Sequence, residues 1–160
     1  MDDQAYMEMA LQAAREAAAA DEAPVGAVIV CDDAVLAVER NRREEWRDPT
    51  AHAELLAIVA ASKTLGNWRL ERCTLFVTLE PCPMCAGAII QARLPRVVYG
   101  ARDAKAGAVR SLYHLLEDSR LNHQVDVREG VLAEPCGAIL TQFFQGKRRT
   151  KSRPPHGDSV

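Results

Sequence analysis

Apolar and polar positions predict a helix and then a β-hairpin in the N-terminal part of the chain. Residues 4–20 repeat apolar positions at helical spacing and are rich in alanine, the residue with the highest helix propensity. Pro24 interrupts this pattern, and two continuous apolar runs follow at 25–31 and 34–39. Because the two aspartates between these runs are typical of a tight turn, we expect the runs to pair as a hairpin.

Helical patterns alternate with short apolar strands over the rest of the chain. The dipeptide Asp48-Pro49 is typical of a helix start. The expected segments, in order, are a helix at 50–65, a strand at 74–79, a helix at 82–93, a strand at 96–99 closed by Gly100, a helix at 111–117, a strand at 125–128 and a helix at 135–145. Helices between the last three strands imply that these strands run parallel, with right-handed crossovers. The pattern predicts an α/β fold of three layers, in which helices cover both faces of a mixed five-stranded sheet.

Length and composition fit a single domain spanning residues 1–160. Hydrophobic residues make up 48% of the chain, which is enough for a buried core without disulfides. Charged residues interrupt the apolar runs well short of a membrane span, and the N-terminal segment has acids where a signal peptide needs bases. We therefore expect a cytoplasmic protein that does not enter a membrane.

The charge of the chain is distributed unevenly. The net charge of −2 gives no general sign of nucleic-acid binding. The C-terminal segment is nevertheless strongly basic, with Lys147, Arg148, Arg149, Lys151 and Arg153 close together. Such a stretch can bind phosphates even on an acidic protein, or it can be a solvated tail. We expect residues 146–160 to be a flexible basic tail.

Two short motifs contain the residue types of a metal site: His52-Ala53-Glu54 and Pro81-Cys82-Pro83-Met84-Cys85. Cys82 and Cys85 are three positions apart at an expected helix start, so their sulfurs share one face and the helix N-terminus favours the thiolate. Together with His52 they supply three ligands. This count leaves the fourth tetrahedral position of Zn²⁺ open for water, as in catalytic sites, whereas structural zinc sites are closed by four ligands.

Glu54 is expected to move protons and not to bind the metal. It lies about 200° around a helix of ~3.6 residues per turn from His52. A zinc-bound water has a pKa near ~7, and Glu54 can take its proton, protonate a ring nitrogen and later protonate the leaving amine. Cys-x-x-Cys alone is also typical of a structural zinc knuckle or a redox pair, but the upstream His-x-Glu favours catalysis. We expect the other cysteines to be small buried residues: Cys31, Cys73 and Cys136.

His-x-Glu followed by Pro-Cys-x-x-Cys is the signature of zinc-dependent nucleobase deaminases. Beyond these motifs, the chain resembles bacterial tRNA adenosine deaminases, of the cytidine/deoxycytidylate deaminase superfamily, nearly end to end. The matching segments are 24–28, Asn41-Arg42, 48–54, 78–88, 100–105 and Phe143-Phe144 before the basic segment. The resemblance implies a cytidine-deaminase-like fold, one Zn²⁺ per subunit and a homodimer. It also implies conversion of adenosine to inosine at the first (wobble) anticodon position of tRNA, by attack of the zinc-bound water on C6 of a flipped adenine.

The same resemblance implies contacts with the anticodon arm. Asn41 is implied to hydrogen-bond the flipped adenine, and the backbone at Ala53 to help hold it. The residues implied along the path of the RNA loop are Asp103, Lys105, Phe144, Lys147 and Arg148. Each has an ordinary alternative: a turn residue for Asn41 and Asp103, a core residue for Phe144, and solvated surface for the cations.

Two positions depart from the pattern of this family. Arg110 stands where we expect a small residue, and it would add a charge near the RNA path. Glu39 stands where small or aromatic residues are more usual. These departures bear on the fine substrate preference and not on the chemistry.

Two other functions remain open at this point. A deaminase of a free guanine- or cytosine-type base, nucleoside or nucleotide would share the metal site but would not need the basic, aromatic C-terminal helix. A non-catalytic zinc or RNA-binding module would have no use for Glu54. The long connection from Gly100 to Val125 favours, by the same resemblance, an open site that admits a polynucleotide.

Overall fold

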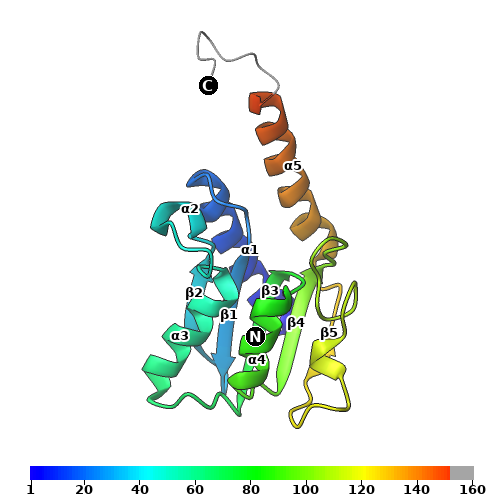
Figure 1. Ribbon diagram of the computed structural model, residues 1–160. Helices are drawn as coiled ribbons and strands as arrows, with labels where there is room; N and C mark the ends of the chain where they lie inside the picture. Colours follow the sequence, from blue (N-terminus) through cyan, green and yellow to red (C-terminus); the bar gives the residue numbers. More distant parts are fainter. Residues whose placement is uncertain (152–160) are drawn as a thin grey trace.

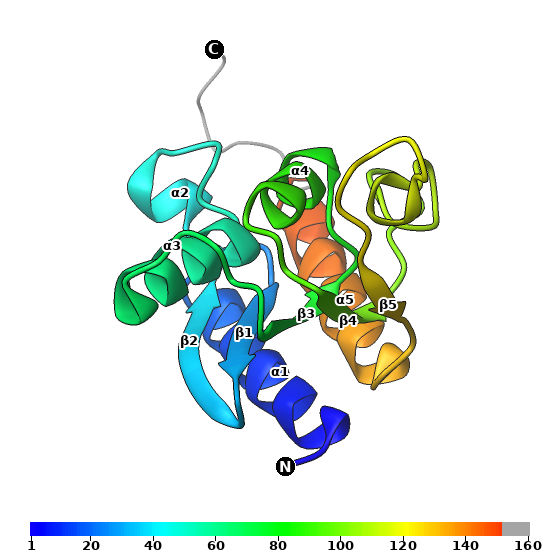
Figure 2. The same ribbon diagram turned by 90° about the horizontal axis from the view of Figure 1, so that it is seen from below.

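The computed structural model describes residues 1–151 and has a five-stranded sheet at its centre. The strand order is β2-β1-β3-β4-β5. Helices α1 and α5 lie on one face of the sheet, and α3 and α4 lie on the other (Figures 1 and 2). The three-layer arrangement that the sequence predicts is therefore confirmed.

Helices and strands follow each other in nearly the predicted order. They are α1 (Asp3–Ala19), β1 (Gly26–Cys31), β2 (Ala34–Arg40), α2 (Arg43–Trp46), α3 (Ala53–Leu65), β3 (Cys73–Leu79), α4 (Pro83–Gln91), β4 (Arg96–Ala101), the 3₁₀ helix η1 (Leu115–Glu117), β5 (Asp126–Arg128) and α5 (Ala133–Lys151). β1 pairs antiparallel with β2 and β3, whereas β3, β4 and β5 run parallel. The hairpin and the three parallel strands are thus confirmed, and the short helix α2 was not predicted.

The central strands are buried on both faces of the sheet, which explains why they are continuous apolar runs in the sequence. Successive side chains of a strand point to opposite faces. Phe76 of β3 accordingly packs in the layer of α1 and α5 with Met7, whereas its neighbour Leu75 packs in the layer of α3 and α4 with Ala57. The three cysteines expected to be small buried residues are indeed buried.

The helix expected at 50–65 begins three residues later, at Ala53. The carboxylate of Asp48 does not cap this helix. It accepts from the backbone N–H and the hydroxyl of Thr50, at 2.8 and 2.7 Å, and so forms a local turn. The N–H at the true start of the helix donates to Asn41, a residue of another segment. The prediction was wrong because the cap comes from tertiary structure.

Two predictions around β4 also need correction. β4 does not close at Gly100 but continues to Ala101, because Gly100 allows a close approach: a Cβ there would lie 2.6 Å from Sγ of Cys136 and 2.8 Å from the Thr78 carbonyl oxygen. The helix expected at 111–117 is reduced to the single turn η1. In a helix that began at Ser111, the N–H of Leu115 would donate to the Ser111 carbonyl oxygen, but here it donates to the carbonyl oxygen of Ala108 in the loop that Glu80 holds.

α5 extends beyond the predicted end at Gln145 and reaches Lys151. Lys147 in this extension pairs with Asp21 at 2.5 Å and lies 5.6 Å from the ring centroid of Phe143. The segment predicted to be a flexible tail is therefore helical over its first part, whereas Arg153 and the rest of 152–160 lie outside the described residues. Within residues 1–151, no helix has the length and apolar character needed to cross a membrane.

Candidate active site

The three predicted metal ligands lie together at the N-terminal ends of two helices. His52 is the N-cap of α3 and Cys82 is the N-cap of α4, and both have extended backbone conformations. Neither makes a side-chain capping bond, so both side chains are free to turn toward each other. Cys85, in the first turn of α4, completes the group.

The distances within this group fit a zinc ion. Nδ1 of His52 lies 3.6 Å from Sγ of Cys82 and 3.5 Å from Sγ of Cys85. All three ligand atoms lie within 4.8 Å of one another. Zinc bonds of roughly 2.3 Å to sulfur and 2.0 Å to nitrogen at a tetrahedral angle require an S–N separation of about 3.5 Å. No other group of potential ligands within residues 1–151 comes this close together.

The electrostatics of the site also suit a cation. Hydrogen bonds from Cys85 and His52 lower the pKa of the Cys82 thiol to about 4, although burial opposes this shift. The thiolate form of Cys82, which binds metals, is thus favoured, whereas the hydrogen bond with Cys82 and burial raise the pKa of the neighbouring Cys85 thiol.

Glu54 lies beside the three ligands but is not part of their close group. It occupies the first turn of α3, its residue is only 4% exposed, and it contributes to the wall of the adjoining cavity. Burial raises its pKa above the ordinary value. The carboxylate is thus positioned to face a molecule bound next to the metal ligands while bulk water is largely excluded.

A cavity of about 660 Å³ opens beside this group, a volume in the range of small-molecule sites. Its walls come from the start of α3, the loop after β4, and α5. They include nearly all of the predicted site residues: Asn41, His52, Glu54, Cys82, Asp103, Lys105, Phe144, Lys147 and Arg148. The fold therefore brings most of the residues predicted from the sequence to one cavity, although what they bind there stays a prediction.

Asn41 connects the end of β2 to the start of α3. Its side chain is nearly buried, and its Oδ1 accepts the backbone N–H of Ala53 at 2.8 Å. None of the residues 1–151 accepts a hydrogen bond from its Nδ2, and Asn41 borders the cavity. The side-chain oxygen of Asn41 is thus fixed by Ala53, and its Nδ2 is available to donate to a molecule in the cavity. The N–H of Ala53 is engaged by Asn41. The predicted contact of the Ala53 backbone with adenine stays a prediction.

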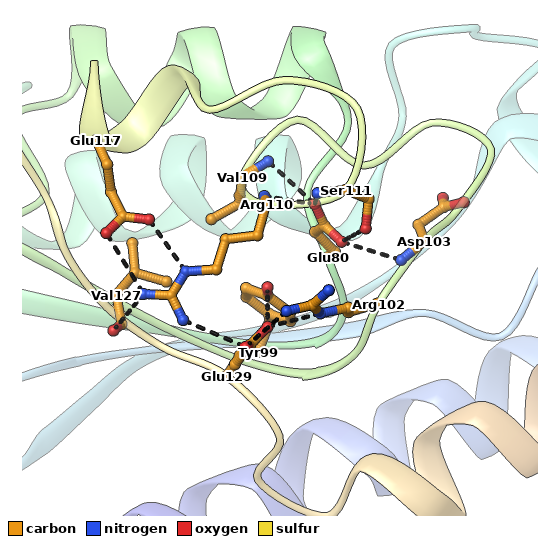
Figure 3. Close-up of polar contacts among 10 residues, drawn as sticks. All are labelled: Glu80, Tyr99, Arg102, Asp103, Val109, Arg110, Ser111, Glu117, Val127 and Glu129. Carbon is orange, nitrogen blue, oxygen red and sulfur yellow. Dashed lines mark hydrogen bonds and ion pairs between the residues drawn. The ribbon is translucent and has the colours of Figure 1, made fainter.

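Glu80 holds the loop that follows β4 (Figure 3). Its carboxylate accepts the backbone N–H groups of Asp103, Val109, Arg110 and Ser111 at 2.9 to 3.1 Å, and the Ser111 hydroxyl at 2.5 Å. Burial opposes ionisation, but these donors together lower the pKa of Glu80. A carboxylate saturated by five donors has no free position for proton transfer, so Glu80 is a structural acid.

The loop held by Glu80 also contains two of the predicted RNA contacts. Asp103 caps a turn of this loop, because its carboxylate accepts the N–H groups of Lys105 and Ala106, both at 3.1 Å. The turn role that was named as an alternative is therefore real. It does not exclude a contact with a ligand, since Asp103 and Lys105 both border the cavity.

Two cations that border the cavity were not predicted from the sequence, Arg43 and Arg102. Arg43 begins α2, which is held by the buried carboxylate of Glu22 through the N–H groups of Glu44 and Glu45. No local pattern could have shown this long-range contact. Arg102 does have a sequence signal, because it lies inside the segment 100–105 on which the resemblance depends.

The two departures from the family pattern lie away from the cavity. Arg110 does not border the cavity, and its guanidinium pairs with Glu117 at 3.1 Å and with Glu129 at 3.4 Å (Figure 3). The charge that was expected near the RNA path is therefore neutralised on the side of β5. Glu39 lies on β2 and likewise does not border the cavity.

Comparison with known proteins identifies similar chains. The family model of MafB19-like deaminases matches residues 1–148. A tRNA-specific adenosine deaminase of Bacillus subtilis (strain 168) is 48% identical over 149 residues, which cover 93% of this chain and 92% of the relative. A tRNA-specific adenosine deaminase of Streptococcus pyogenes serotype M1 is 48% identical over 153 residues, which cover 94% of this chain and 90% of the relative.

Solved structures show the same relationship. A structure from a study of A-to-I editing by tRNA:A34 deaminases at the wobble position superimposes with a TM-score of 0.82 at 46% identity, covering 85% of this chain and 99% of that chain. A structure of a guanine deaminase from Nitrosomonas europaea gives a TM-score of 0.77 at 26% identity, covering 88% and 83%. The fold is thus common to deaminases of different substrates.

Proposed function

This chain belongs to the family of MafB19-like deaminases, and we propose that it converts adenosine to inosine at the first anticodon position of tRNA. The observation that carries the proposal is that one cavity joins two kinds of residues. The metal ligands His52 and Cys82 and the acid Glu54 line it, and so do the aromatic and basic residues of α5: Phe144, Lys147 and Arg148. The relatives at 48% identity are named tRNA-specific adenosine deaminases, and the solved structure at 46% identity comes from a study of deaminases that edit the wobble position.

The runner-up is a deaminase of a free base such as guanine, which shares the fold at 26% identity. A free base offers few polar groups and no phosphate. The wall contributed by α5 would be superfluous for it, because Phe144 is 45% exposed and Arg148 is also exposed. The composition of this wall therefore favours a polynucleotide.

The metal is proposed to be zinc, one ion per subunit, held by Nδ1 of His52 and the sulfurs of Cys82 and Cys85. Bound there, zinc would supply Lewis-acid chemistry, which makes water a nucleophile near neutral pH. The ligand count, the ligand types and the 3.5 to 3.6 Å separations support this assignment.

Glu54 is proposed to carry the protons of the reaction. Hydrolysis of adenosine adds one water and releases ammonia, so both protons of the water must move: one to a ring nitrogen, where inosine keeps it, and the other to the departing amine. A single carboxylate at the cavity wall can make these transfers in turn. Asn41, with Oδ1 fixed by Ala53, is proposed to donate from Nδ2 to a ring nitrogen of the purine and so orient it.

The remaining predicted residues are proposed to bind the anticodon loop. Bases of a loop are partly unstacked already, so turning one into the cavity requires less free energy than extracting it from a duplex. Phe144 offers an aromatic face for a neighbouring base. Lys105, Lys147 and Arg148 offer charges for phosphates, and Asp103 shapes the turn that carries Lys105.

We further propose that the protein is a cytoplasmic homodimer. The outer surface of α3 and α4 has a hollow of about 490 Å³. Val59 and Trp68 border this hollow and are 51% and 57% exposed. Contiguous exposed apolar surface of this kind is typical of an interface. Sedimentation of the purified protein and of a Val59→Arg variant would test the assignment, which a monomeric unchanged protein would contradict.

The activity itself is tested by incubating the protein with total tRNA and with free nucleosides, digesting the RNA, and measuring inosine. We expect inosine in the tRNA and almost none from free adenosine. Guanine or cytosine compounds deaminated in the absence of any change in tRNA would establish the runner-up instead.

A further inference from the structure

Two arginines and two glutamates form a cluster of ion pairs (Figure 3). Glu129, just after β5, is its centre and pairs with Arg102 at 3.0 Å and with Arg110 at 3.4 Å. Arg110 also pairs with Glu117 of η1. Of the two arginines, only Arg102 borders the cavity.

We propose that Arg110 is a positioning residue that frees Arg102 to bind a phosphate of the RNA. Arg110 keeps Glu129 neutralised when Arg102 leaves it, and so it raises the affinity for RNA without touching the RNA. The inference rests on the proposed function, because it requires a polynucleotide in the cavity.

The position of Arg102 is that of a phosphate-binding residue. It borders the same cavity as His52 and Lys105, and its side chain is 61% exposed. A guanidinium binds phosphate well because its N–H groups match two phosphate oxygens. In the present structure, however, Nε and Nη2 of Arg102 both donate to Glu129. Arg102 must therefore give up Glu129 in order to bind a phosphate.

The hydrogen bonds of Glu129 show how this exchange is made easier. Oε1 accepts from Arg102 at 3.0 Å and faces Nη1 of Arg110 at 3.4 Å. Oε2 accepts from the Tyr99 hydroxyl at 2.7 Å and from Arg102 at 3.0 Å. When Arg102 leaves, each oxygen thus keeps one partner from the described part of the chain. Without Arg110, Oε1 would keep none, and Arg102 would be held more firmly.

Arg110 itself is not positioned to bind RNA. Its side chain is 28% exposed and its guanidinium is directed to Glu117, Glu129 and the carbonyl oxygen of Val127. Of the groups that the Arg110 guanidinium contacts, only Glu129 also contacts Arg102, so Glu129 is the route by which Arg110 would act on the RNA.

The test compares the variants Arg110→Gln and Arg102→Gln and their combination, with Arg120→Gln as the control. Arg120 lies in the same segment between β4 and β5, pairs with Asp118 and has a side chain that is 87% exposed. The control therefore removes one positive charge from the same segment without touching Glu129. The readouts are kcat and KM for an anticodon stem-loop over a range of salt concentrations, together with zinc content and thermal unfolding.

We expect Arg110→Gln to raise KM about three- to tenfold with kcat unchanged, in line with the loss of one partly exposed ion pair. Arg102→Gln should raise KM at least as much and lower the salt slope by up to ~0.7, the value for one phosphate contact on a single strand. Adding Arg110→Gln to Arg102→Gln should change nothing further. Arg110→Lys should recover part of the affinity, and Arg120→Gln should resemble the unchanged protein.

Three results would overturn the inference. The first is an unchanged KM in Arg110→Gln. The second is a rise in KM in the double variant that equals the product of the two single rises, because independent effects would mean that Arg110 does not act through Arg102. A fall in the zinc content of Arg110→Gln would likewise overturn the inference, because it would show that Arg110 only maintains the structure. If the unchanged protein did not act on the stem-loop at all, the proposed function would fail and this inference with it. An active unchanged protein with multiplying losses would remove the inference alone.

Discussion

Replacing Glu80 by glutamine should destabilise the protein and loosen one wall of the cavity while leaving the metal ligands intact. Glutamine keeps the size of the side chain but turns one carboxylate oxygen into an NH₂ group. If its oxygen replaces Oε2, the three N–H groups of Val109, Arg110 and Ser111 keep an acceptor, now a neutral one. The NH₂ group then faces the N–H of Asp103, which is left without its acceptor.

The magnitude follows from these contacts. A hydrogen bond to a charged group contributes about 1.5–3 kcal/mol and a neutral one about 0.5–1.5, and an unsatisfied buried donor costs about 1–3 kcal/mol. Several donors share one charge, so the losses are not additive, and removal of a buried charge offsets part of them. We therefore expect a loss of about 2–4 kcal/mol, which is a large part of the ~5–15 kcal/mol of a typical domain.

Urea denaturation measures this loss, with Glu71→Gln as a matched exposed control. In the same variant, KM for an anticodon stem-loop should rise more than kcat falls, because the loop that carries Asp103 and Lys105 loses its anchor. Zinc content should not change. An unaltered urea midpoint would refute the structural role. A fall in kcat as deep as that of a Glu54 variant, with KM unchanged, would instead make Glu80 a proton carrier.

Three further predictions concern the metal, the proton carrier and the C-terminal helix. Cys85→Ala should reduce zinc far below one ion per chain in metal analysis, and full occupancy would show that the ligand set is wrong. Glu54→Gln should lower kcat by roughly 10²–10⁴-fold while zinc content and the thermal transition persist; loss of zinc would make Glu54 a ligand. Truncation after Gly146 removes the basic end of the chain, so it should raise KM for the stem-loop and flatten its salt dependence. Identical activity-against-salt curves for both proteins would show that the basic segment is only solvated surface.

Patterns that depend on neighbours in the sequence predicted the structure well. The strands were found because burial on both faces of the sheet requires uninterrupted apolar runs. The spacing of Cys82 and Cys85 placed both sulfurs in one helical turn, and the His-x-Glu motif identified His52 as the third ligand. These features need no knowledge of distant residues.

Features that depend on distant residues were missed or misplaced. α3 begins at Ala53 because Asn41, from the end of β2, accepts its first free N–H. The helix expected at 111–117 is short because the N–H of Leu115 donates to Ala108, in the loop that Glu80 holds, and not to Ser111. Arg43 borders the cavity because it lies at the start of α2, whose backbone N–H groups donate to the distant Glu22. In each case one buried polar side chain decides the backbone of a segment far away in the chain.

The most direct test of the proposed function compares three substrates of the same enzyme preparation. The first is an anticodon stem-loop with adenosine at its first anticodon position. The second is the same stem-loop with that adenosine moved to another position of the loop, and the third is free adenosine. Inosine formation gives kcat/KM for each. We expect the first substrate to exceed free adenosine by about 10²-fold or more, since each stacking contact of a flanking base contributes about 1–3 kcal/mol. Free adenosine turned over as efficiently as the first stem-loop would contradict the assignment of this protein to the tRNA wobble position.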